Sequence, residues 1–433
     1  MHPLSYARRA LFFSVDRLDG GRVKRHLAEV RRLMEGGRTA QHAHQQQQLQ
    51  RLLAHARSTV PHYASTGPHW RDFPVVNKNS IRREEARFLS SAFPTTDLLK
   101  TTTSGSTGTP FTVFLDKNKK ARNTADTLYF ASRTNYRLGD RLYYLKIWSA
   151  SNRKSRLGAF AQNVVMSDVL LMDDAYAARV VKAWKAESGP FAVIGYASAI
   201  EHLCRYLSRT ESAPLRTAMS SAIAISETLS DETKETFQRY FGVPLVSRYS
   251  NLENGIIAQT CPKFPEYHIN SASYLVEILR MDRDEPVEPG TSGRIVLTDL
   301  YNFGMPFIRY DTGDVGTLQA ASACDFDSPV LSKVEGRKLD LLYDTQGRLV
   351  SSLLVYKNMW QYEELLQYQL VQTGKKDYLL RLNPATTFTR SDQITREFRS
   401  FFGPDAVINI EIVDDIPLLA SGKRRKVVNM YYK

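Results

Sequence analysis

The sequence predicts an α/β protein with a large N-terminal domain and a small C-terminal α+β domain. Its 433 residues are too many for one ordinary hydrophobic core, which favours at least two domains. Between residues 73 and 250, short apolar runs alternate with longer amphipathic stretches, which predicts mainly parallel sheets covered by helices. After residue 270, strand-like segments joined by turns indicate an antiparallel or barrel-like β subdomain.

The first 70 or so residues are predicted to be helical and polar. Arg8 and Arg9 precede the apolar residues 10–13, but this run is too short for a signal peptide. Asp16 and Asp19 follow it closely. The chain is therefore predicted to begin with an amphipathic helix.

The alternating region resolves into individual elements. The expected strands cover residues 142–147, 191–194, 218–225 and 245–249. The expected helices cover residues 173–186, 200–207 and 229–241. Ser230 is the predicted N-cap of the third helix, because its hydroxyl can accept a bond from a free backbone N–H group.

The C-terminal part has a different texture. Strands are expected at residues 274–279 and 293–300, with prolines and a glycine in the turn between them. The last hundred or so residues form a small α+β unit, with the following expected elements: strands 378–382 and 406–412, and helix 394–402. We place the domain boundary near residues 336–340. This gives a large domain at 1–337, whose residues 1–70 are a helical N-terminal segment, and a small one at 338–433.

Composition and charge narrow the classes of function. The chain is 42% hydrophobic and 24% charged, as in folded globular proteins, and no apolar run reaches the length of a membrane span. A net charge of +13 fits an anionic ligand, such as a nucleotide, an acidic saccharide or a membrane surface. Nucleic acid is not an expected partner, because no nucleic-acid-binding signature is present. The three cysteines form no disulfide framework and favour the cytoplasm.

The strongest chemical signal is a loop of hydroxyl side chains and glycines at residues 101–110, TTTSGSTGTP. Glycines let a backbone approach a ligand closely, and consecutive N–H groups with hydroxyls form a nest for phosphate oxygens. The loop is no Walker A site, because no Gly-Lys-Ser/Thr follows it. A flexible linker is the alternative. However, residues 111–115 resume a strand directly, so the segment predicts phosphate binding.

Two further segments carry carboxylates where a ligand could use them. Residues 248–255 follow a strand, and ligands of open α/β sheets bind beyond the carboxyl ends of strands. There, Tyr249 can offer a flat face to a base, and Glu253 can hold Mg²⁺. In residues 309–314, Asp314 follows a tight Thr-Gly turn and can accept bonds from ribose hydroxyls. The ordinary alternatives are a capped turn with an exposed glutamate and a hairpin aspartate.

Two basic residues complete the set of motifs. Arg337 lies in residues 336–340, and Lys423 ends the Ser-Gly turn of residues 417–423. A lysine on such a turn is usually a solvated surface charge. It gains meaning only if an anionic ligand lies beside it.

In this order, the five segments resemble those of the adenylate-forming superfamily, which contains acyl-CoA synthetases, peptide-synthetase adenylation domains and luciferases. The nearest resemblance is to its phenylacetate–CoA ligase-like branch, particularly to members associated with capsular polysaccharide biosynthesis. It runs from about residue 50 to residue 430. Any one motif is weak, but all five in one order make coincidence improbable. The resemblance implies that the small C-terminal domain is a mobile lid.

The resemblance also implies roles for the matching residues. Lys423, Glu253 and Thr107 would be catalytic, with Lys423 contacting the carboxylate and the α-phosphate and Glu253 binding Mg²⁺. The acyl group would lie against Tyr196, Ser226 and Tyr249. ATP would be bound by Thr103, Ser104, Gly105, Ser106, Thr107, Gly108, Ser226, Glu227, Tyr249, Asp314 and Arg337. Within that set, Tyr249 would pack on the adenine, Asp314 would bind the ribose, and Arg337 would reach the ribose and phosphates.

Three positions depart from the family pattern. Ser250 stands where the family usually has glycine, and Asp311 stands where it usually has arginine. Asp340 lies three residues after Arg337 instead of two, which puts its role as the hinge in doubt. None of these changes removes a charged group from its implied task.

A cysteine–histidine set lies where some relatives hold a structural zinc ion. Cys261, His268 and Cys324 supply three ligands, and relatives usually have one more cysteine. Three ligands leave a closed tetrahedral site incomplete. Buried cysteines and a surface histidine without metal are therefore expected, and zinc is not an expected cofactor.

The predicted activity is ATP-dependent activation of a carboxylate as an acyl-adenylate, with release of pyrophosphate. A carboxylate is already a nucleophile, so the reaction needs positioned cations more than a strong base. The acyl group would then pass to coenzyme A or to an amine or hydroxyl acceptor, in surface-polysaccharide biosynthesis. Expected cofactors are ATP and Mg²⁺. Expected partners are a small-molecule or glycan-linked carboxylate and, peripherally, membrane glycan machinery.

Two alternatives to this activity are open. One is an adenylyltransferase that leaves AMP on a small molecule or carrier. The other is a non-catalytic nucleotide-binding scaffold, against which the presence of both Glu253 and Lys423 argues.

Overall fold

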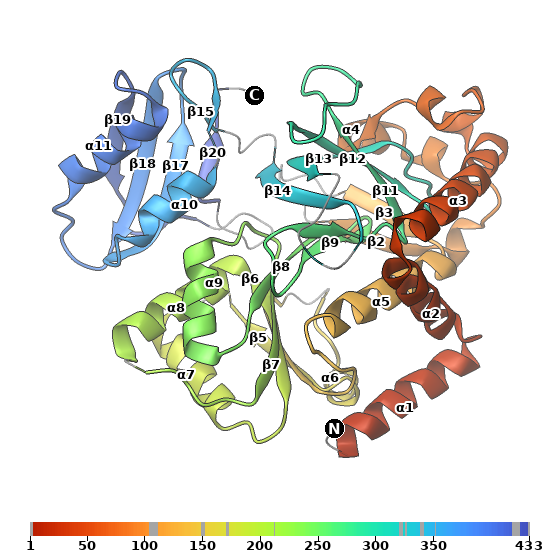
Figure 1. Ribbon diagram of the computed structural model, residues 1–433, viewed down its shortest axis with the longest axis horizontal. Coiled ribbons are helices and arrows are strands. Elements are labelled where there is room, and N and C mark those ends of the chain that lie inside the picture. The colour runs from red at the N-terminus through yellow and green to blue at the C-terminus, as the bar shows by residue number, and fades with distance from the viewer. Residues whose placement is uncertain are drawn as a thin grey trace.

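A computed structural model describes most of the chain. The described residues are 3–103, 111–148, 152–169, 173–211, 213–319, 324, 327–337, 342–350, 352–417 and 425–431. In these ranges the chain forms a large α/β part and a separate small α+β domain, so the predicted fold class is confirmed (Figure 1). None of the described helices is long and apolar enough to cross a membrane.

A twelve-stranded sheet forms the centre of the large part as far as the chain is described. Its parallel half has the order β5 (Val164–Asp168), β4 (Arg141–Lys146), β6 (Phe191–Tyr196), β7 (Met219–Ile225) and β8 (Leu245–Asn251). The central strands β6 and β7 are almost fully buried, as expected for strands covered on both faces. The predicted parallel sheet is therefore present.

The antiparallel half continues the same sheet beyond β8. It has the order β9 (Gly255–Thr260), β10 (Tyr267–Ile269), β14 (Val330–Arg337), β13 (Tyr310–Gln319), β12 (Ser292–Asp299) and β11 (Tyr274–Leu279). The short strand β1 (Val76–Asn77) pairs in parallel with the start of β13. The strands predicted at residues 274–279 and 293–300 are β11 and β12.

Three helices cover one face of the parallel half: α7 (Asp174–Lys185), α8 (Ala197–Thr210) and α9 (Asp231–Phe241). In α8, Ile200, Leu203 and Leu207 recur at helical spacing and are fully buried. At the start of α9, the Ser230 hydroxyl accepts a bond from the N–H of Thr233, which confirms the predicted N-cap.

The N-terminal region is helical, as predicted. Its helices are α1 (Pro3–Leu18), α2 (Arg22–Glu35) and α3 (Gly37–Thr59), and α2 packs along α5 (Lys117–Ser132). Short 3₁₀ turns follow at Pro61–Tyr63, Trp70–Asp72, Glu85–Phe88 and Thr95–Asp97. The remaining elements of the large part are α4 (Lys78–Arg83), the hairpin of β2 (Leu99–Thr103) and β3 (Phe111–Leu115), and α6 (Arg156–Ala161).

The small C-terminal domain has a four-stranded sheet and its own core. The sheet order is β19 (Val407–Ile412), β18 (Asp377–Pro384), β17 (Leu365–Gln372) and β20 (Val427–Asn429). Beside this sheet lie a two-stranded hairpin and two helices: β15 (Leu342–Tyr343), β16 (Leu349–Val350), α10 (Ser352–Trp360) and α11 (Ser391–Phe402). From α11, Ile394, Phe398 and Phe402 enter the core at helical spacing. This independent core supports a separate domain, although the boundary at residue 338 stays a prediction.

Candidate active site

The carboxyl ends of the parallel strands bring three of the predicted residues together. Tyr196 ends β6 and pairs with Ile225 of β7, which in turn pairs with Arg248 of β8. Ser226 and Tyr249, the next residues, therefore lie beside Tyr196 at one edge of the sheet. This is the edge at which open α/β sheets bind ligands.

Strand β13 faces this edge. Tyr310, Thr312 and Asp314 contact this edge, and the regular alternation of the strand is interrupted between Asp311 and Val315, where Gly313 has φ +78°. Tyr310 donates a hydrogen bond to Glu253, and Thr312 and Asp314 both accept bonds from the Tyr249 hydroxyl. β13 thus connects the two segments that the sequence had suggested separately.

Tyr249 and Asp314 form the tighter of these contacts. The Tyr249 hydroxyl donates to Asp314 Oδ2 at 2.7 Å and to Thr312 Oγ1 at 3.3 Å. Burial, and next the negative charge of Asp314, raise the pKa of Tyr249 well above its usual value, so the phenol stays protonated and remains a donor. The carboxylate that is predicted to bind ribose is therefore held beside the ring that is predicted to bind adenine.

Glu253 is a buried carboxylate with a cation beside it. It lies in the turn between β8 and β9 and is only 2% exposed. Its Oε1 accepts a hydrogen bond of 2.9 Å from the Tyr310 hydroxyl and lies 2.7 Å from the ammonium of Lys78. Buried charges need such partners, because desolvation of an unpaired carboxylate is costly. The alternative of an exposed glutamate on a turn is therefore wrong.

Lys78 is the residue that sequence reasoning missed. β1 pairs with β13, which brings Val76 beside Tyr310, and α4 starts at Lys78. The Asn77 side chain caps α4 by accepting bonds from the N–H groups of Asn79 and Ser80. This Asn-x-x-Ser pattern could have indicated the helix start. No sequence pattern pairs Lys78 with Glu253.

The hydroxyl-rich loop begins and ends near this pair. Strands β2 and β3 pair up to Thr103 and Phe111, and the Lys78 ammonium lies 5.8 Å from the centre of the Phe111 ring. The side chain of Thr103 and all of Ser104, Gly105, Ser106, Thr107 and Gly108 lie outside the described residues. Their predicted contacts with phosphate stay predictions.

Ser226 and Glu227 form a tight turn after β7. Ser226 has φ +73°, a conformation that residues other than glycine rarely adopt. Glu227 Oε2 accepts a 2.8 Å bond from the N–H of Ser198 in the first turn of α8, where a carboxylate also meets the positive end of the helix dipole. In this structure, Glu227 therefore fixes the end of β7 against the start of α8.

Burial, followed by the charges of neighbouring groups, raises the pKa of Tyr196 to about 12.

The end of β14 reaches the same edge. Arg337 pairs with Asp314 across β13 and β14. A Cβ placed on Gly336 would lie 3.9 Å from Thr228 Oγ1, so this strand passes the turn after β7. The Arg337 side chain and Asp340 lie outside the described residues, and the predicted roles of both stay untested.

Lys423 also lies outside the described residues, but the strand that follows it is held against the large part. Lys426 pairs with Glu201 of α8, and the guanidinium of Arg205 lies 4.6 Å from the Trp360 ring centre. Arg205 also donates to the carbonyl of Met359 at 3.3 Å. Burial alone would raise the pKa of Glu201, but Lys426 and Arg205 outweigh it and lower that pKa, so this carboxylate is ionised at neutral pH. The small domain is thus docked on α8, the helix that begins directly after Tyr196.

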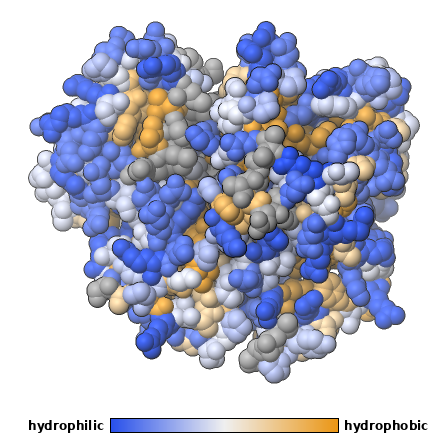
Figure 2. Space-filling model, in the orientation of Figure 1, coloured by the Kyte–Doolittle hydropathy of each residue, from blue (hydrophilic) through white to orange (hydrophobic). Residues whose placement is uncertain are grey.

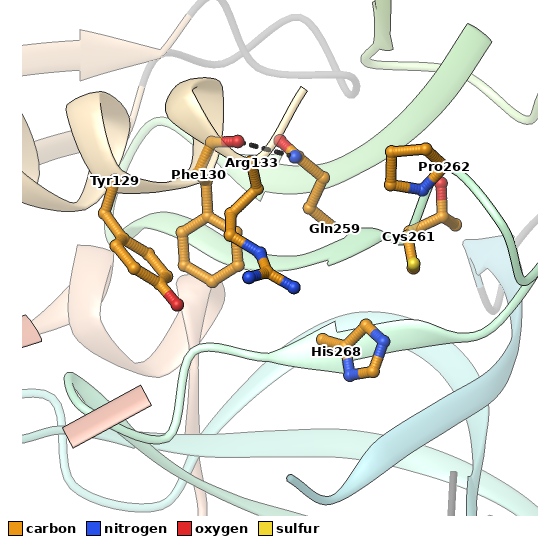
Figure 3. A pocket seen from close by; sticks show the side chains of 8 residues that line it. Tyr129, Phe130, Arg133, Gln259, Cys261, Pro262 and His268 are labelled. Atoms are coloured by element: carbon orange, nitrogen blue, oxygen red, sulfur yellow. Dashed lines mark hydrogen bonds between the residues drawn. The ribbon is translucent and has the colours of Figure 1, made fainter. Parts of the chain in front are cut away.

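The cysteine–histidine set is brought together on the antiparallel side. One ligand atom from each of Cys261, His268 and Cys324 lies within 4.8 Å of the others, and the two sulfur atoms are 3.6 Å apart. Figure 3 shows the Cys261 sulfur and the His268 ring pointing toward one another in a small pocket. His268 is buried, so its interpretation as a surface histidine is wrong, and the two cysteines are half-buried. Burial, and then the charge of Arg133, lower the pKa of His268 to about 4, which leaves a neutral imidazole.

Comparison with known sequences gives two matches. Residues 342–430 match the family model of the CapK C-terminal domain. Protein CapK of Staphylococcus aureus is 22% identical over 367 residues, which cover 82% of this chain and 79% of CapK. The C-terminal match coincides with the small domain and its separate core.

Comparison with solved structures finds chains of the same fold that hold an acyl-AMP or ATP. A 2-hydroxyisobutyryl-CoA ligase in its postadenylation state, in complex with R3-HIB-AMP, matches with a TM-score of 0.71 at 15% identity, over 92% of this chain and 91% of the ligase. ATP-bound MatB from Rhodopseudomonas palustris matches with a TM-score of 0.55 at 14% identity, over 78% and 68% of the two chains. The resemblance to the adenylate-forming ligases is confirmed, and the chain has their fold.

The same ligase in another state matches less well. In its thioesterification state, with 2-HIB-AMP and CoA, the TM-score is 0.57 at 16% identity, although 93% of this chain is still covered. Equal coverage with a lower score indicates a difference in how the parts are arranged. The arrangement described here is nearer to the postadenylation one.

Proposed function

We propose that this chain is an ATP-dependent ligase that activates a carboxylate as an acyl-adenylate and releases pyrophosphate. One observation carries the proposal: a buried carboxylate, Glu253, and a Tyr249–Asp314 pair meet at the carboxyl edge of the sheet, beside both ends of the hydroxyl-rich loop. Glu253 suits a metal bound to phosphate, and the Tyr249–Asp314 pair suits a nucleoside. The hydroxyl-rich loop suits the phosphate chain. The fold supports the same assignment.

In this proposal, the nucleoside lies between the turn after β7 and strand β13. Tyr249 packs on the adenine, and Asp314 accepts bonds from the ribose hydroxyls. Arg337, on the strand paired with β13, reaches the ribose and phosphates. Tyr196 and Ser226 border the acyl pocket beside them, because the strand register puts all these residues at one edge.

The phosphates are proposed to lie between the loop of residues 104–110 and Glu253. A cationic group already lies 2.7 Å from Glu253, so this position accepts positive charge, and a hard oxygen ligand suits Mg²⁺. When bound, Mg²⁺ would neutralise charge on the leaving pyrophosphate. Lys78 would share this task, since its ammonium lies 2.7 Å from Glu253 and 5.8 Å from the ring centre of Phe111, the residue that follows the loop. Lys423 would contact the attacking carboxylate and the α-phosphate, and Thr107 would bind phosphate.

We propose transfer to a thiol such as coenzyme A, or to an amine or hydroxyl acceptor, as the second half-reaction. The small domain would rotate between the two steps, and the two states of the 2-hydroxyisobutyryl-CoA ligase support such a movement. The similarity to CapK supports a role in surface-polysaccharide assembly, with a small-molecule or glycan-linked acid as substrate. The proposed use of ATP by this chain supports a cytoplasmic location.

Against the expectation from the sequence, we propose that the cluster of Cys261, His268 and Cys324 holds a zinc ion through three protein ligands, one fewer than a closed structural site has. The neutral, buried imidazole and two thiols within 4.8 Å are ligands that zinc prefers. The N–H of Lys263 lies 3.5 Å from Cys261 Sγ and would stabilise a thiolate there. Elemental analysis of the purified chain should give close to one zinc per chain, lost in the Cys261→Ser variant. Wild-type protein without bound metal, even after exposure to zinc, would refute the assignment.

The test of the proposed function is direct detection of its intermediate. The chain is incubated with ATP, Mg²⁺ and a panel of aryl, fatty, amino and uronic acids, and the products are identified by mass spectrometry. An acyl-adenylate from one class of acid, consumed when coenzyme A or an amine is added, supports the proposal and names the acceptor. AMP that stays on the final product would favour an adenylyltransferase. ATP binding without any product would favour a scaffold.

A further inference from the structure

Exposed hydrophobic side chains are concentrated on two helices far from the candidate active site. Of the fifteen large hydrophobic residues that are exposed among those described, seven lie on α1 and α6. These helices have only 16 and 6 residues. The seven residues are Leu4, Tyr6, Leu11, Val15, Leu18, Leu157 and Phe160. Such a concentration indicates an interaction surface, whereas scattered exposed residues would not.

The residues on α1 form a stripe along one side of the helix. Leu4, Leu11, Val15 and Leu18 are spaced by seven, four and three positions, which places them on one face. Their side chains are 58%, 57%, 57% and 89% exposed. An apolar helix face normally packs against the core, whereas this stripe on α1 is exposed.

The helix is attached to the rest of the chain by other residues. The backbones of Ser5 and Gly139 touch, since a Cβ on Gly139 would lie 2.2 Å from the Ser5 carbonyl oxygen. Asp16 is buried and accepts hydrogen bonds from the N–H groups of Val23 and Lys24 at 2.9 and 3.0 Å, which fixes the end of α1 to the start of α2. The helix is therefore held in place with its apolar stripe turned outward.

Helix α6 extends the same surface. The guanidinium of Arg8 lies 5.4 Å from the centre of the Phe160 ring, which joins the two helices. Leu157 and Phe160, three positions apart, are 82% and 72% exposed. Figure 2 shows hydrophobic side chains gathered at the lower right of the molecule, where Figure 1 places α1 and α6.

The charge around this apolar surface is positive. Residues 3–18 contain one acidic residue, Asp16, which is turned inward, and residues 152–161 contain none. The basic residues of these two segments are Arg8, Arg9, Arg17, Arg153, Lys154 and Arg156. A symmetric dimer through this face would bring these charges against their own copies, which argues against a second copy as the occupant. An anionic surface complements them.

We propose that α1 and α6 form a docking surface for an anionic lipid bilayer. A helix with an apolar stripe and basic residues beside it binds in the plane of the membrane interface, with its apolar side chains among the acyl chains and its cations near the headgroups. This would place the chain on the membrane surface, while none of the helices in the described part of the chain is long and apolar enough to cross the bilayer. The inference does not depend on the proposed adenylation.

Sedimentation with vesicles tests the proposal. The wild-type chain is mixed with vesicles of phosphatidylcholine alone or with added phosphatidylglycerol, at low and high salt. The chain should sediment with the anionic vesicles only, and less at high salt, because salt screens the attraction. The Leu11→Asp/Leu18→Asp variant should bind the anionic vesicles at least roughly tenfold more weakly, since two anchoring side chains are lost.

A matched control carries the same change on the other domain. Leu366→Asp/Ile412→Asp replaces two similarly exposed residues, 49% and 57%, and should bind like wild type. Equal thermal unfolding of the variants shows that each is folded. The proposal is overturned if wild type does not sediment with anionic vesicles, or if the α1 variant binds as well as the control. It is also overturned if light scattering finds a wild-type dimer that the α1 variant dissociates, because a second copy then covers this face.

Discussion

At the scale of single residues, the site depends on which groups contact a buried carboxylate. Glu253 is almost fully buried, and its Oε1 has a phenol and an ammonium as partners. Removing one partner of such a pair leaves the other charge uncompensated, which costs far more than the pair itself contributes. In the proposed function, the Lys78–Glu253 pair would therefore prepare the carboxylate for a metal and offer a cation to the phosphates.

Replacing Lys78 by methionine should weaken MgATP use. We expect KM for MgATP to rise by about tenfold or more, because a charge-assisted interaction of about 1.5–3 kcal/mol is lost. Lys78→Arg keeps the charge and should lose less. Lys100→Met, at an exposed position of β2, should behave like wild type. A KM unchanged in Lys78→Met, measured with folded protein, would exclude a role for Lys78 in binding the nucleotide.

His268 should make the stability of metal-free protein depend on pH. Its folded pKa is about 4, below its ordinary value near 6.5, so the unfolded chain binds the proton first as the pH falls. This contribution is complete above about pH 6.5 and is lost between there and about pH 4, at no more than about 1.4 kcal/mol per pH unit. The unfolding midpoint of metal-stripped wild type should fall more steeply over this window than that of His268→Asn. Parallel curves would contradict the prediction.

Much of the site could be predicted at this scale, and the reason for the exceptions is physical. Tyr249 and Glu253 stand in a motif predicted to follow a strand, Asp314 stands in one built on a Thr-Gly turn, and the structure brings all three together. Lys78 could not be found, because its pairing arises from β1 lying beside β13, a contact between distant parts of the chain. The three zinc-type ligands were found as residues, but their proximity also required the fold.

At the scale of elements, the turn after β7 stores backbone strain where the ligand is expected. Ser226 adopts φ +73° without being glycine, and such residues persist only where the surroundings enforce them. Glu227, the next residue, supplies that restraint through its bond to the start of α8. The turn holds Tyr196, Ser226 and Tyr249 in one arrangement.

Glycine at position 226 should relieve this strain. Compared with Ser226→Ala, which loses the same hydroxyl but keeps the Cβ, Ser226→Gly should be more stable by about 1 kcal/mol. The comparison isolates the backbone effect, and denaturant unfolding of the two variants measures it. If Ser226→Ala proved the more stable of the two, the positive φ would not be a source of strain.

The elements that the sequence predicted well are those with a plain hydrophobic pattern. The strands β4, β6, β7 and β8 and the helices α7, α8 and α9 lie within a few residues of their expected bounds. Helix α5 was missed because Lys119, Arg122 and Asp126 are buried in it through ion pairs, which hides its apolar face. Strand β5 was missed because it is an edge strand with mostly half-buried residues.

At the scale of the whole molecule, the small domain is docked on helix α8 of the large part. Glu201, Arg205 and Lys426 join α8 to the small domain, and Trp360 packs on the same helix layer. Sequence motifs identified the domain and its lysine, but the docked arrangement follows from contacts between domains that no local pattern encodes.

Breaking this contact should loosen the docked arrangement. In Glu201→Gln the charge that attracts Lys426 is absent, so the radius of gyration from small-angle X-ray scattering should increase. The adenylation rate should fall by about tenfold, and the rate of transfer from preformed acyl-adenylate should fall less. Glu235→Gln, at an exposed position of α9, should match wild type in both measurements. Scattering and rates identical to wild type in Glu201→Gln would show that the contact does not hold the domains together.

The central claim is that the carboxyl edge around Glu253 activates a carboxylate with ATP, and carboxylate-dependent ATP–pyrophosphate exchange tests it most directly. With an acid that the panel identifies, wild type and the exposed control Glu288→Gln should exchange at equal rates. Glu253→Gln should lose about a hundredfold or more, because it removes a group that positions charge in the transition state. Exchange that persists at the wild-type rate in Glu253→Gln, or that needs no carboxylate, would contradict the account.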